Sequence, residues 1–82
     1  PDDPSVADSW GWLKFRQGQL DQAESTLRNA WLKRKDADIG VHLAEVLWDR
    51  GEHDEARKVL NEVRRIDPKN ASLERTERKL KP

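Results

Sequence analysis

Two histidines and many carboxylates are the side chains of this 82-residue chain that could take part in catalysis or hold a metal. His42 and His53 lie on different predicted helices, and neither is followed four residues later by the second His or carboxylate of an H-E-x-x-H type zinc site. The carboxylates alternate with Lys and Arg, as in segments 62–66 and 74–78, which is typical of solvated helix faces rather than of a paired acid and base. Cysteine is absent, which excludes thiolate sites and cysteine nucleophiles. We therefore expect no enzyme activity, no metal and no cofactor.

The charge balance argues against a protein that binds polyanions. Sixteen basic and sixteen acidic residues give a net charge of zero, so the long-range positive field of most nucleic-acid-binding proteins is missing. The charge is unevenly spread, because residues 64–82 carry seven bases and three acids. The alternative is therefore a nucleic-acid-binding helical repeat that uses residues 33–35, this basic end and exposed tryptophans. We expect no small-molecule substrate, no nucleic acid and no direct membrane contact, since no apolar run is long enough for a span.

The chain repeats itself with an offset of 33 residues. Gly18 is equivalent to Gly51, and three residues later Asp21 is equivalent to Asp54. Glycine adopts the positive φ that ends a helix, and Asp is a good cap for the next one. Each segment therefore predicts a tight turn between two helices. The other equivalent pairs that keep their chemical class are Val6 and Ile39, Trp10 and Leu43, Gly11 and Ala44, Leu13 and Val46, Phe15 and Trp48, Ala23 and Ala56, and Leu27 and Leu60.

Apolar residues at helical spacing flank both turns. The predicted helices span residues 4–17, 21–33, 37–50 and 54–66, followed by a short polar helix over 71–81. Asp3 is expected to cap the first helix and Asn70 the fifth, while Pro68 ends the fourth. Val6, Trp10 and Leu13 are expected to form the core stripe of the first helix. No strand pattern is present, so the predicted fold class is all-α, an α-solenoid of two antiparallel helix pairs with a C-terminal capping helix.

The helix pair resembles the tetratricopeptide repeat, a helix–turn–helix unit of about 34 residues. The specific part of the resemblance is the turn and the small residue early in the second helix, Ala23 or Ala56, followed by Leu27 or Leu60. The chain departs from the family pattern at Lys14, which replaces a packing aromatic residue. The resemblance implies a single domain over residues 1–82, with repeat one at 4–36, repeat two at 37–69 and the capping helix at 70–82.

Tetratricopeptide proteins typically bind an extended peptide or a partner's helix on the concave face formed by the first helix of each pair. The resemblance therefore implies a protein-interaction module or scaffold whose partner is a protein or peptide. The residues expected to contact the partner are Asp8, Trp12, Phe15, Arg16, Glu45, Trp48, Asp49, Arg75 and Lys79. Trp12 is favoured among them, because its equivalent in repeat two is the charged Glu45. For Phe15 and Trp48 two alternatives stay open, the groove and the core.

The two ends of the repeat array lead to different expectations. The polar fifth helix is typical of the C-terminal end of an array. Trp10 and Lys14 at the other end have no preceding helix to cover them, so we expect self-association through this uncapped N-terminal face. Segments 8–12 and 42–48 are similar to the last repeats of bacterial tetratricopeptide lipoproteins. That resemblance implies a C-terminal fragment of a longer adaptor protein, with a lipid anchor upstream, on the periplasmic side of the bacterial cell envelope.

Overall fold

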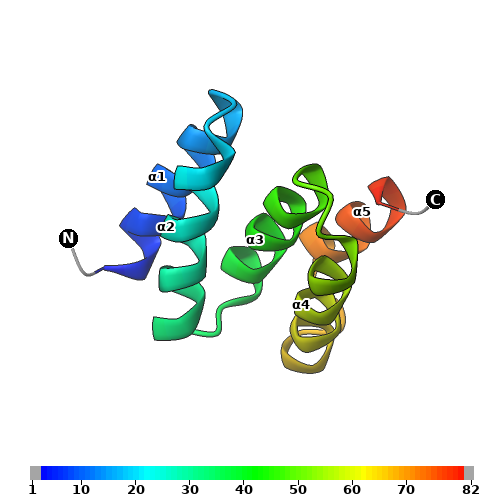
Figure 1. The fold of residues 1–82 in the computed structure, drawn as a ribbon. Helices are drawn as coiled ribbons and strands as arrows, with labels where there is room; N and C mark the ends of the chain where they lie inside the picture. The colour runs from blue at the N-terminus through cyan, green and yellow to red at the C-terminus, as the bar shows by residue number, and fades with distance from the viewer. Residues whose placement is uncertain (1–2, 81–82) are drawn as a thin grey trace.

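Five helices in a row make up the computed structural model, which describes residues 3–80. They are α1 (Pro4–Arg16), α2 (Leu20–Lys33), α3 (Ala37–Asp49), α4 (His53–Ile66) and α5 (Ala71–Lys79). Successive helices run in opposite directions and pack on one another, so the chain advances from one end of the molecule to the other (Figure 1). Strands are absent from the described residues, which confirms the predicted all-α class. In the same residues no helix combines the length and the apolar character needed to cross a membrane.

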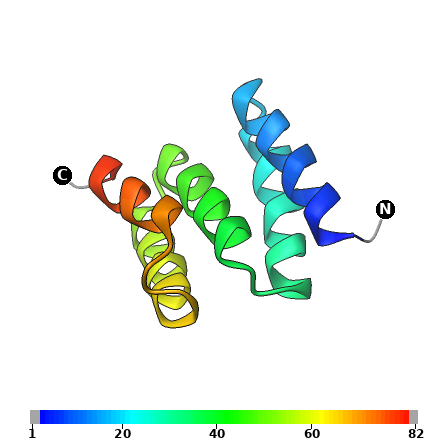
Figure 2. The ribbon, with the colours of Figure 1, turned by 180° about the vertical axis from the view of Figure 1, so that it is seen from behind.

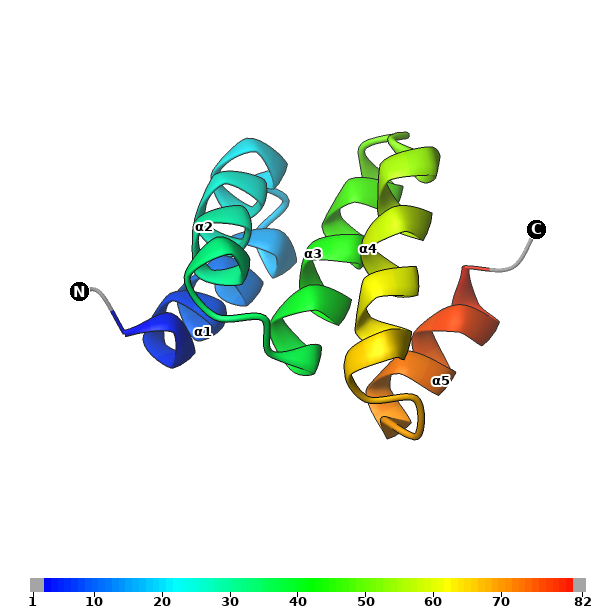
Figure 3. The same cartoon turned by 90° about the horizontal axis from the view of Figure 1, so that it is seen from below.

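The helices form two curved layers. The first helices of the pairs, α1 and α3, lie with α5 along one face, which Figure 2 shows towards the viewer. The second helices, α2 and α4, lie behind them, and the view from below separates the two layers (Figure 3). Because α3 touches α1, α2, α4 and α5, it is the central helix of the molecule. This arrangement is that of a short α-solenoid.

The helix ends follow the predicted turns closely. Gly18 and Gly51 have φ values of 81° and 84°, which confirms the left-handed turns expected from their spacing. Asp3 caps α1 by accepting a 2.9 Å hydrogen bond from the backbone N–H of Ser5, and Asn70 caps α5 in the same way through Leu73. The last helix was expected to reach residue 81, but it ends at Lys79 with Leu80 as its C-cap, and residue 81 lies outside the described residues.

The expected caps of the second and fourth helices are wrong. Gln19 and Glu52 occupy the cap positions, without a side-chain hydrogen bond to the helix. The helices start earlier because the backbone N–H groups of these two residues bond back to the preceding helix, at 2.9 Å in both cases. Asp21 and Asp54 therefore lie in the first turn, where a carboxylate favours the positive end of the helix dipole.

Small residues set how closely the helices approach. Ala23 and Ala56 are fully buried, as are Leu27 and Ala44, so the predicted packing of the two second helices is confirmed. The closest approach is at Gly40, where an added Cβ would lie 2.5 Å from Val63 Cγ2 and 2.7 Å from the Trp31 ring. Contact at this distance leaves no room for even a methyl group. The core therefore depends on exact fit across α2, α3 and α4.

The apolar stripe of α1 is not core. Val6, Trp10 and Leu13 are 45–52% exposed, which corrects the expectation of a core stripe and agrees with the expectation that Trp10 lies uncovered on the N-terminal face. Their equivalents in α3 are at most 2% exposed, because α2 packs over that side of α3. No described helix occupies the corresponding place beside α1, so the same pattern is surface in repeat one and core in repeat two.

Ion pairs on the outer layer connect the two repeats. Arg28 of α2 bonds to Glu55 of α4 at 2.7 Å, and Lys35, in the loop after α2, bonds to Glu62 of α4 at 3.2 Å. The hydrogen bond from Arg28 is the main reason that the pKa of Glu55 lies below its usual value. A lowered pKa means that this carboxylate contributes stability above its unfolded pKa and loses that contribution as the pH falls through its folded pKa.

We predict that Gly40→Ala destabilises the protein by roughly 1–3 kcal/mol, because the new methyl group displaces Val63 and Trp31. Urea unfolding followed by circular dichroism measures this loss. Ala7→Gly is the matched control, since Ala7 holds the equivalent place in α1; it should cost only the ~1 kcal/mol of helix propensity. A gain in stability for Gly40→Ala would contradict the close approach.

We predict that Glu55→Gln lowers stability by less than about 1 kcal/mol at neutral pH, as expected for a partly exposed ion pair. The difference from wild type should shrink as the pH falls through the usual pKa of Glu and vanish only below the lowered folded-state pKa of Glu55, where the wild-type carboxyl is neutral in both states. Thermal unfolding across pH tests this, with Asp49→Asn on the exposed end of α3 as the control. If Glu55→Gln and wild type still differ in stability in acid, the loss comes from side-chain packing and not from the ion pair.

Candidate functional site

A hollow of about 280 Å³ spans α1, α3 and α5 on the face shown in Figure 2. Trp12 supplies the wall on α1, while α3 and α5 supply the rest. The residues that line it are Trp12, Val41, His42, Glu45, Ser72, Arg75, Thr76 and Lys79. Four of these were expected to contact a partner, so the structure brings Trp12, Glu45, Arg75 and Lys79 together. We call this hollow the inner groove.

One wall of the inner groove is an aromatic stack. The ring of His42 lies 4.2 Å from that of Trp12, with an angle of 23° between the planes, and the Phe15 ring lies 4.8 Å from that of Trp12. His42 Nδ1 is 2.7 Å from Asp8 Oδ1, which ties α3 to α1. Asp8, another expected contact residue, is thus engaged with His42 beside the groove. The stack holds Trp12 in one orientation, half-buried at the groove surface.

Glu45 is a structural residue of the groove floor. It is 9% exposed, and its carboxylate accepts a 3.3 Å hydrogen bond from the Thr76 hydroxyl and lies 3.6 Å from Lys79 Nζ. Glu45 thus lines the inner groove, but its carboxylate is already engaged within the protein. A buried carboxylate needs partners because its desolvation is costly, and α5 supplies both of them.

Arg75 gives the inner groove an available positive charge. Its guanidinium donates a 3.2 Å hydrogen bond to the Ser72 hydroxyl, and it forms no ion pair within residues 3–80. The side chain is exposed. The groove therefore combines an aromatic wall on α1 with a hydrogen-bond donor on α5. Residues that contribute most to binding at protein interfaces typically combine apolar contact with a polar group in this way.

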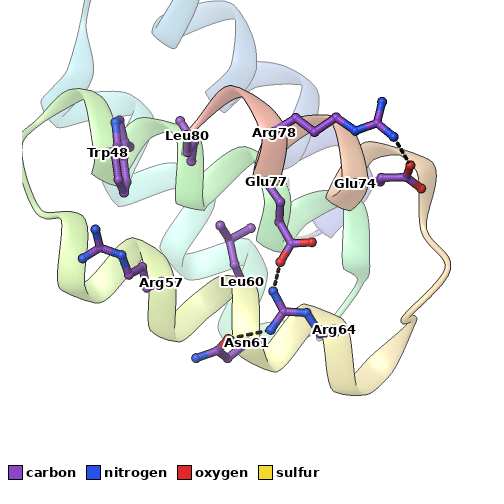
Figure 4. A pocket seen from close by; sticks show the side chains of 9 residues that line it. All are labelled: Trp48, Arg57, Leu60, Asn61, Arg64, Glu74, Glu77, Arg78 and Leu80. Carbon is purple, nitrogen blue, oxygen red and sulfur yellow. Dashed lines mark hydrogen bonds and ion pairs between the residues drawn. The ribbon is translucent and has the colours of Figure 1, made fainter. Parts of the chain in front are cut away.

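Trp48 lies in a different hollow, of about 490 Å³, between α4 and α5 (Figure 4). Its ring stacks on His53 at 3.8 Å, and the Arg57 guanidinium lies 5.2 Å above it. Trp48 therefore does not share the inner groove with Trp12, because it sits at the far end of α3, where α5 ends. Both Trp48 and Phe15 are half-buried and pack against the core, which favours the core alternative for these two rings.

The remaining expected contact residues, Arg16 and Asp49, lie at the exposed ends of α1 and α3 and line neither hollow. Sequence reasoning missed His42, Ser72 and Thr76 as groove residues. His42 precedes Glu45 by three positions on the same helix, and this spacing places both on one face. That spacing could have identified His42 as a groove residue from the sequence. No sequence pattern identifies Ser72 and Thr76 as groove residues, because their role depends on how α5 packs on α3.

Local ion pairs engage much of the positive charge that nucleic-acid binding would use. Lys35 pairs with Glu62, Lys79 with Glu45, and Arg78 with Glu74 at 2.6 Å. Arg64 pairs with Glu77 across α4 and α5 (Figure 4). In residues 3–80 no three His, Asp or Glu side chains are grouped to hold a metal ion. The chemistry that the inner groove offers is binding through apolar contact, hydrogen bonds and two cationic side chains, of which Lys79 is paired with Glu45.

We predict that Thr76→Val loosens α5, since it removes the hydroxyl that bonds to the buried Glu45 carboxylate. The expected loss is about 1 kcal/mol or more, together with faster amide hydrogen exchange in α5. Ser72→Ala is the matched control, because its hydroxyl serves only the exposed Arg75 side chain among the described contacts. Equal exchange in α5 for Thr76→Val and wild type would refute the role given to Glu45.

Comparison with known proteins agrees with this geometry. A family model described as Tetratricopeptide repeat matches residues 14–80. A TPR repeat-containing protein of Pseudomonas aeruginosa is 47% identical to this chain over 45 residues, which are 55% of the chain and 8% of that protein. The chain thus spans a small part of the length of the curated protein that it matches. With its two helix pairs, its glycine turns and a match over most of its residues, the chain belongs to the tetratricopeptide repeat family.

Proposed function

We propose that this chain is a protein-interaction module that binds an extended peptide or a partner's helix in the inner groove. Tetratricopeptide repeats generally serve as protein-interaction modules rather than as enzymes. The observation that carries the proposal is the inner groove itself, in which Trp12 of α1, His42 of α3 and Arg75 of α5 line one hollow. A ligand lying across the three helices would contact all of them at once.

The inner groove is prepared for a ligand before one binds. The Trp12 ring contacts the rings of Phe15 and His42, so little side-chain entropy is lost when a partner packs on it. Its aromatic ring is of the kind that anchors many interfaces. The acidic groups, Asp8 and Glu45, are already engaged within the protein, so they leave Arg75 as the charged side chain ready to select a partner.

We also propose, as the wider setting of this module, a longer adaptor protein of a bacterial cell envelope. The support is the similarity of the repeats to those of envelope lipoproteins and the bacterial source of the matching protein. In such a protein the inner groove would hold one segment of a partner while other parts of the protein hold the rest. The avidity gained from linked contacts makes weak binding by a small groove useful.

We predict that peptides selected from a random library against the wild-type chain lose at least tenfold in affinity for Trp12→Ala. Fluorescence anisotropy of labelled peptides measures the affinity, and circular dichroism checks that the helices persist. Trp10→Ala is the matched control, since it removes the same ring from another face of the same helix. Arg75→Ala, at an exposed side chain of the groove, gives a second test should Trp12→Ala unfold.

Equal affinity of wild type, Trp12→Ala and Arg75→Ala would contradict the proposal. Titration with salt tests the nucleic-acid alternative in the same experiment. Binding to phosphates falls steeply with salt, while binding to an aromatic groove changes little. Tight, salt-sensitive binding of an oligonucleotide without any selected peptide would replace the proposed function with that alternative.

A further inference from the structure

His42 gives the inner groove a side chain whose charge depends on pH. It comes from α3, which lies between α1 and α5. Its Nδ1 is 2.7 Å from Asp8 Oδ1, and its ring stacks on Trp12. Histidine changes its charge between about pH 5 and pH 8. Because the side chains of His42 and Asp8 are only 27% and 17% exposed, solvent screens this change of charge incompletely.

The bond between His42 and Asp8 is compatible with both charge states of the ring. An ionised carboxylate only accepts hydrogen bonds, so the 2.7 Å contact places a hydrogen on Nδ1 whether the ring is neutral or charged. Protonation adds the second hydrogen at Nε2, makes the bond to Asp8 charge-assisted, and puts a cation against the face of Trp12. The link between α1 and α3 therefore persists, while the groove wall gains a positive charge.

Four other charged side chains surround His42 at the groove. Asp8 of α1 and Glu45 of α3 are negative, while Arg75 and Lys79 of α5 are positive. These four charges cancel when His42 is neutral. When His42 is protonated, the sum becomes positive by one charge. Since Lys79 is paired with Glu45, and the charged His42 would be paired with Asp8, Arg75 is then left as a cation without an opposing charge.

The other groups packed around α3 leave this balance unchanged. The helices α2 and α4 contact α3, but none of their side chains lines the inner groove. Asp38 lies one turn before His42 on α3. It is exposed, does not line the groove, and accepts a 3.5 Å hydrogen bond from the Asn70 amide. The charge of His42 is therefore the variable quantity in the groove near neutral pH.

The size and lining of the groove indicate which peptide side chains fit it. A volume of about 280 Å³ is at the lower end of pockets that enclose small molecules, so it takes one or two side chains of a longer segment. Trp12 offers an aromatic surface to an apolar side chain. Arg75 offers a guanidinium, whose planar donors match a carboxylate. The complementary pair in a partner is an apolar residue beside Asp or Glu.

We propose that His42 is a specificity-determining residue of the inner groove, and that its protonation strengthens binding of a peptide segment that carries Asp or Glu beside an apolar residue. This inference rests on the proposed function, because it concerns the peptide held in the same groove. The carboxylate lies against Arg75 and the apolar side chain against Trp12. Mild acid tightens binding, and by reciprocity the binding of the segment makes the protein take up protons.

Parallel selections from a random peptide library at about pH 6 and pH 8 test the proposal, since Asp and Glu of the peptides stay ionised at both. Peptides recovered at the lower pH should carry an acidic residue beside an apolar one. Labelled copies with blocked ends should bind the wild-type chain roughly two- to fivefold more tightly at the lower pH, the effect of a partly exposed charge pair. Replacing the acidic residue of the peptide by its amide should remove this difference.

His42→Asn tests the residue itself. Its side-chain amide can donate to Asp8 from the place of Nδ1 but carries no charge, so peptide affinity should no longer change with pH. His53→Asn is the matched control, because His53 is the other histidine of the chain and stacks on Trp48, away from the inner groove. This variant should keep the pH dependence of wild type.

A measurement on the wild-type chain alone covers the case in which His42→Asn does not fold. Titration calorimetry of a selected peptide in two buffers with different heats of protonation should show proton uptake on binding near neutral pH.

The outcomes separate this inference from the proposed function. Peptides without acidic residues, wild-type affinities that do not change with pH, binding without proton uptake, or an unchanged pH dependence in His42→Asn would each overturn the inference and leave the proposed function standing. If no peptide is recovered at either pH, or if Trp12→Ala and Arg75→Ala bind the selected peptides like wild type, the proposed function fails and this inference fails with it.

Discussion

Each helix pair of this protein has an apolar side that it cannot bury by itself, and the rest of the structure depends on that constraint. The same sequence positions show both outcomes. Ile39, Leu43 and Val46 are buried because α2 covers α3, while their equivalents in α1 stay exposed. Whether these side chains are buried therefore depends on the neighbouring helices and not on the repeat sequence. Stability in such a protein is close to a sum over repeats and the interfaces between them, and the buried side chains of α3, packed on α2 and α4, contribute to both.

The same stacking creates the inner groove. Placing α1, α3 and α5 along one face brings Trp12, His42 and Arg75 to one hollow, although they are far apart in the sequence. The helix α5 has two roles in this arrangement. Its Thr76 and Lys79 satisfy the buried carboxylate of Glu45, and its Arg75 provides the groove with a positive charge. A partner bound in the groove would therefore add to the contacts that hold α5 on α3.

The sequence was sufficient to predict the helices, the glycine turns and the family, because these depend on local spacing and on an internal repeat. It was less informative about which faces are covered. The stripe of Val6, Trp10 and Leu13 reads as core by its period, and only the absence of a covering helix makes it surface. Glu45 reads as an exposed charge because its partners lie on α5, thirty-one residues away in the case of Thr76. Contacts between helices far apart in the sequence determine whether such residues are buried, and the spacing of apolar residues does not reveal those contacts.

The most direct test of this account is native-state amide hydrogen exchange, measured residue by residue on the wild-type chain. Exchange reports the free energy of opening each segment. Since α3 is packed on four neighbouring helices, and α1 and α5 lie at the ends, the account predicts the slowest exchange in the buried turns of α3, with faster exchange in α1 and α5. Protection in α1 equal to that in α3 would contradict the claim that neighbouring helix pairs supply the stability.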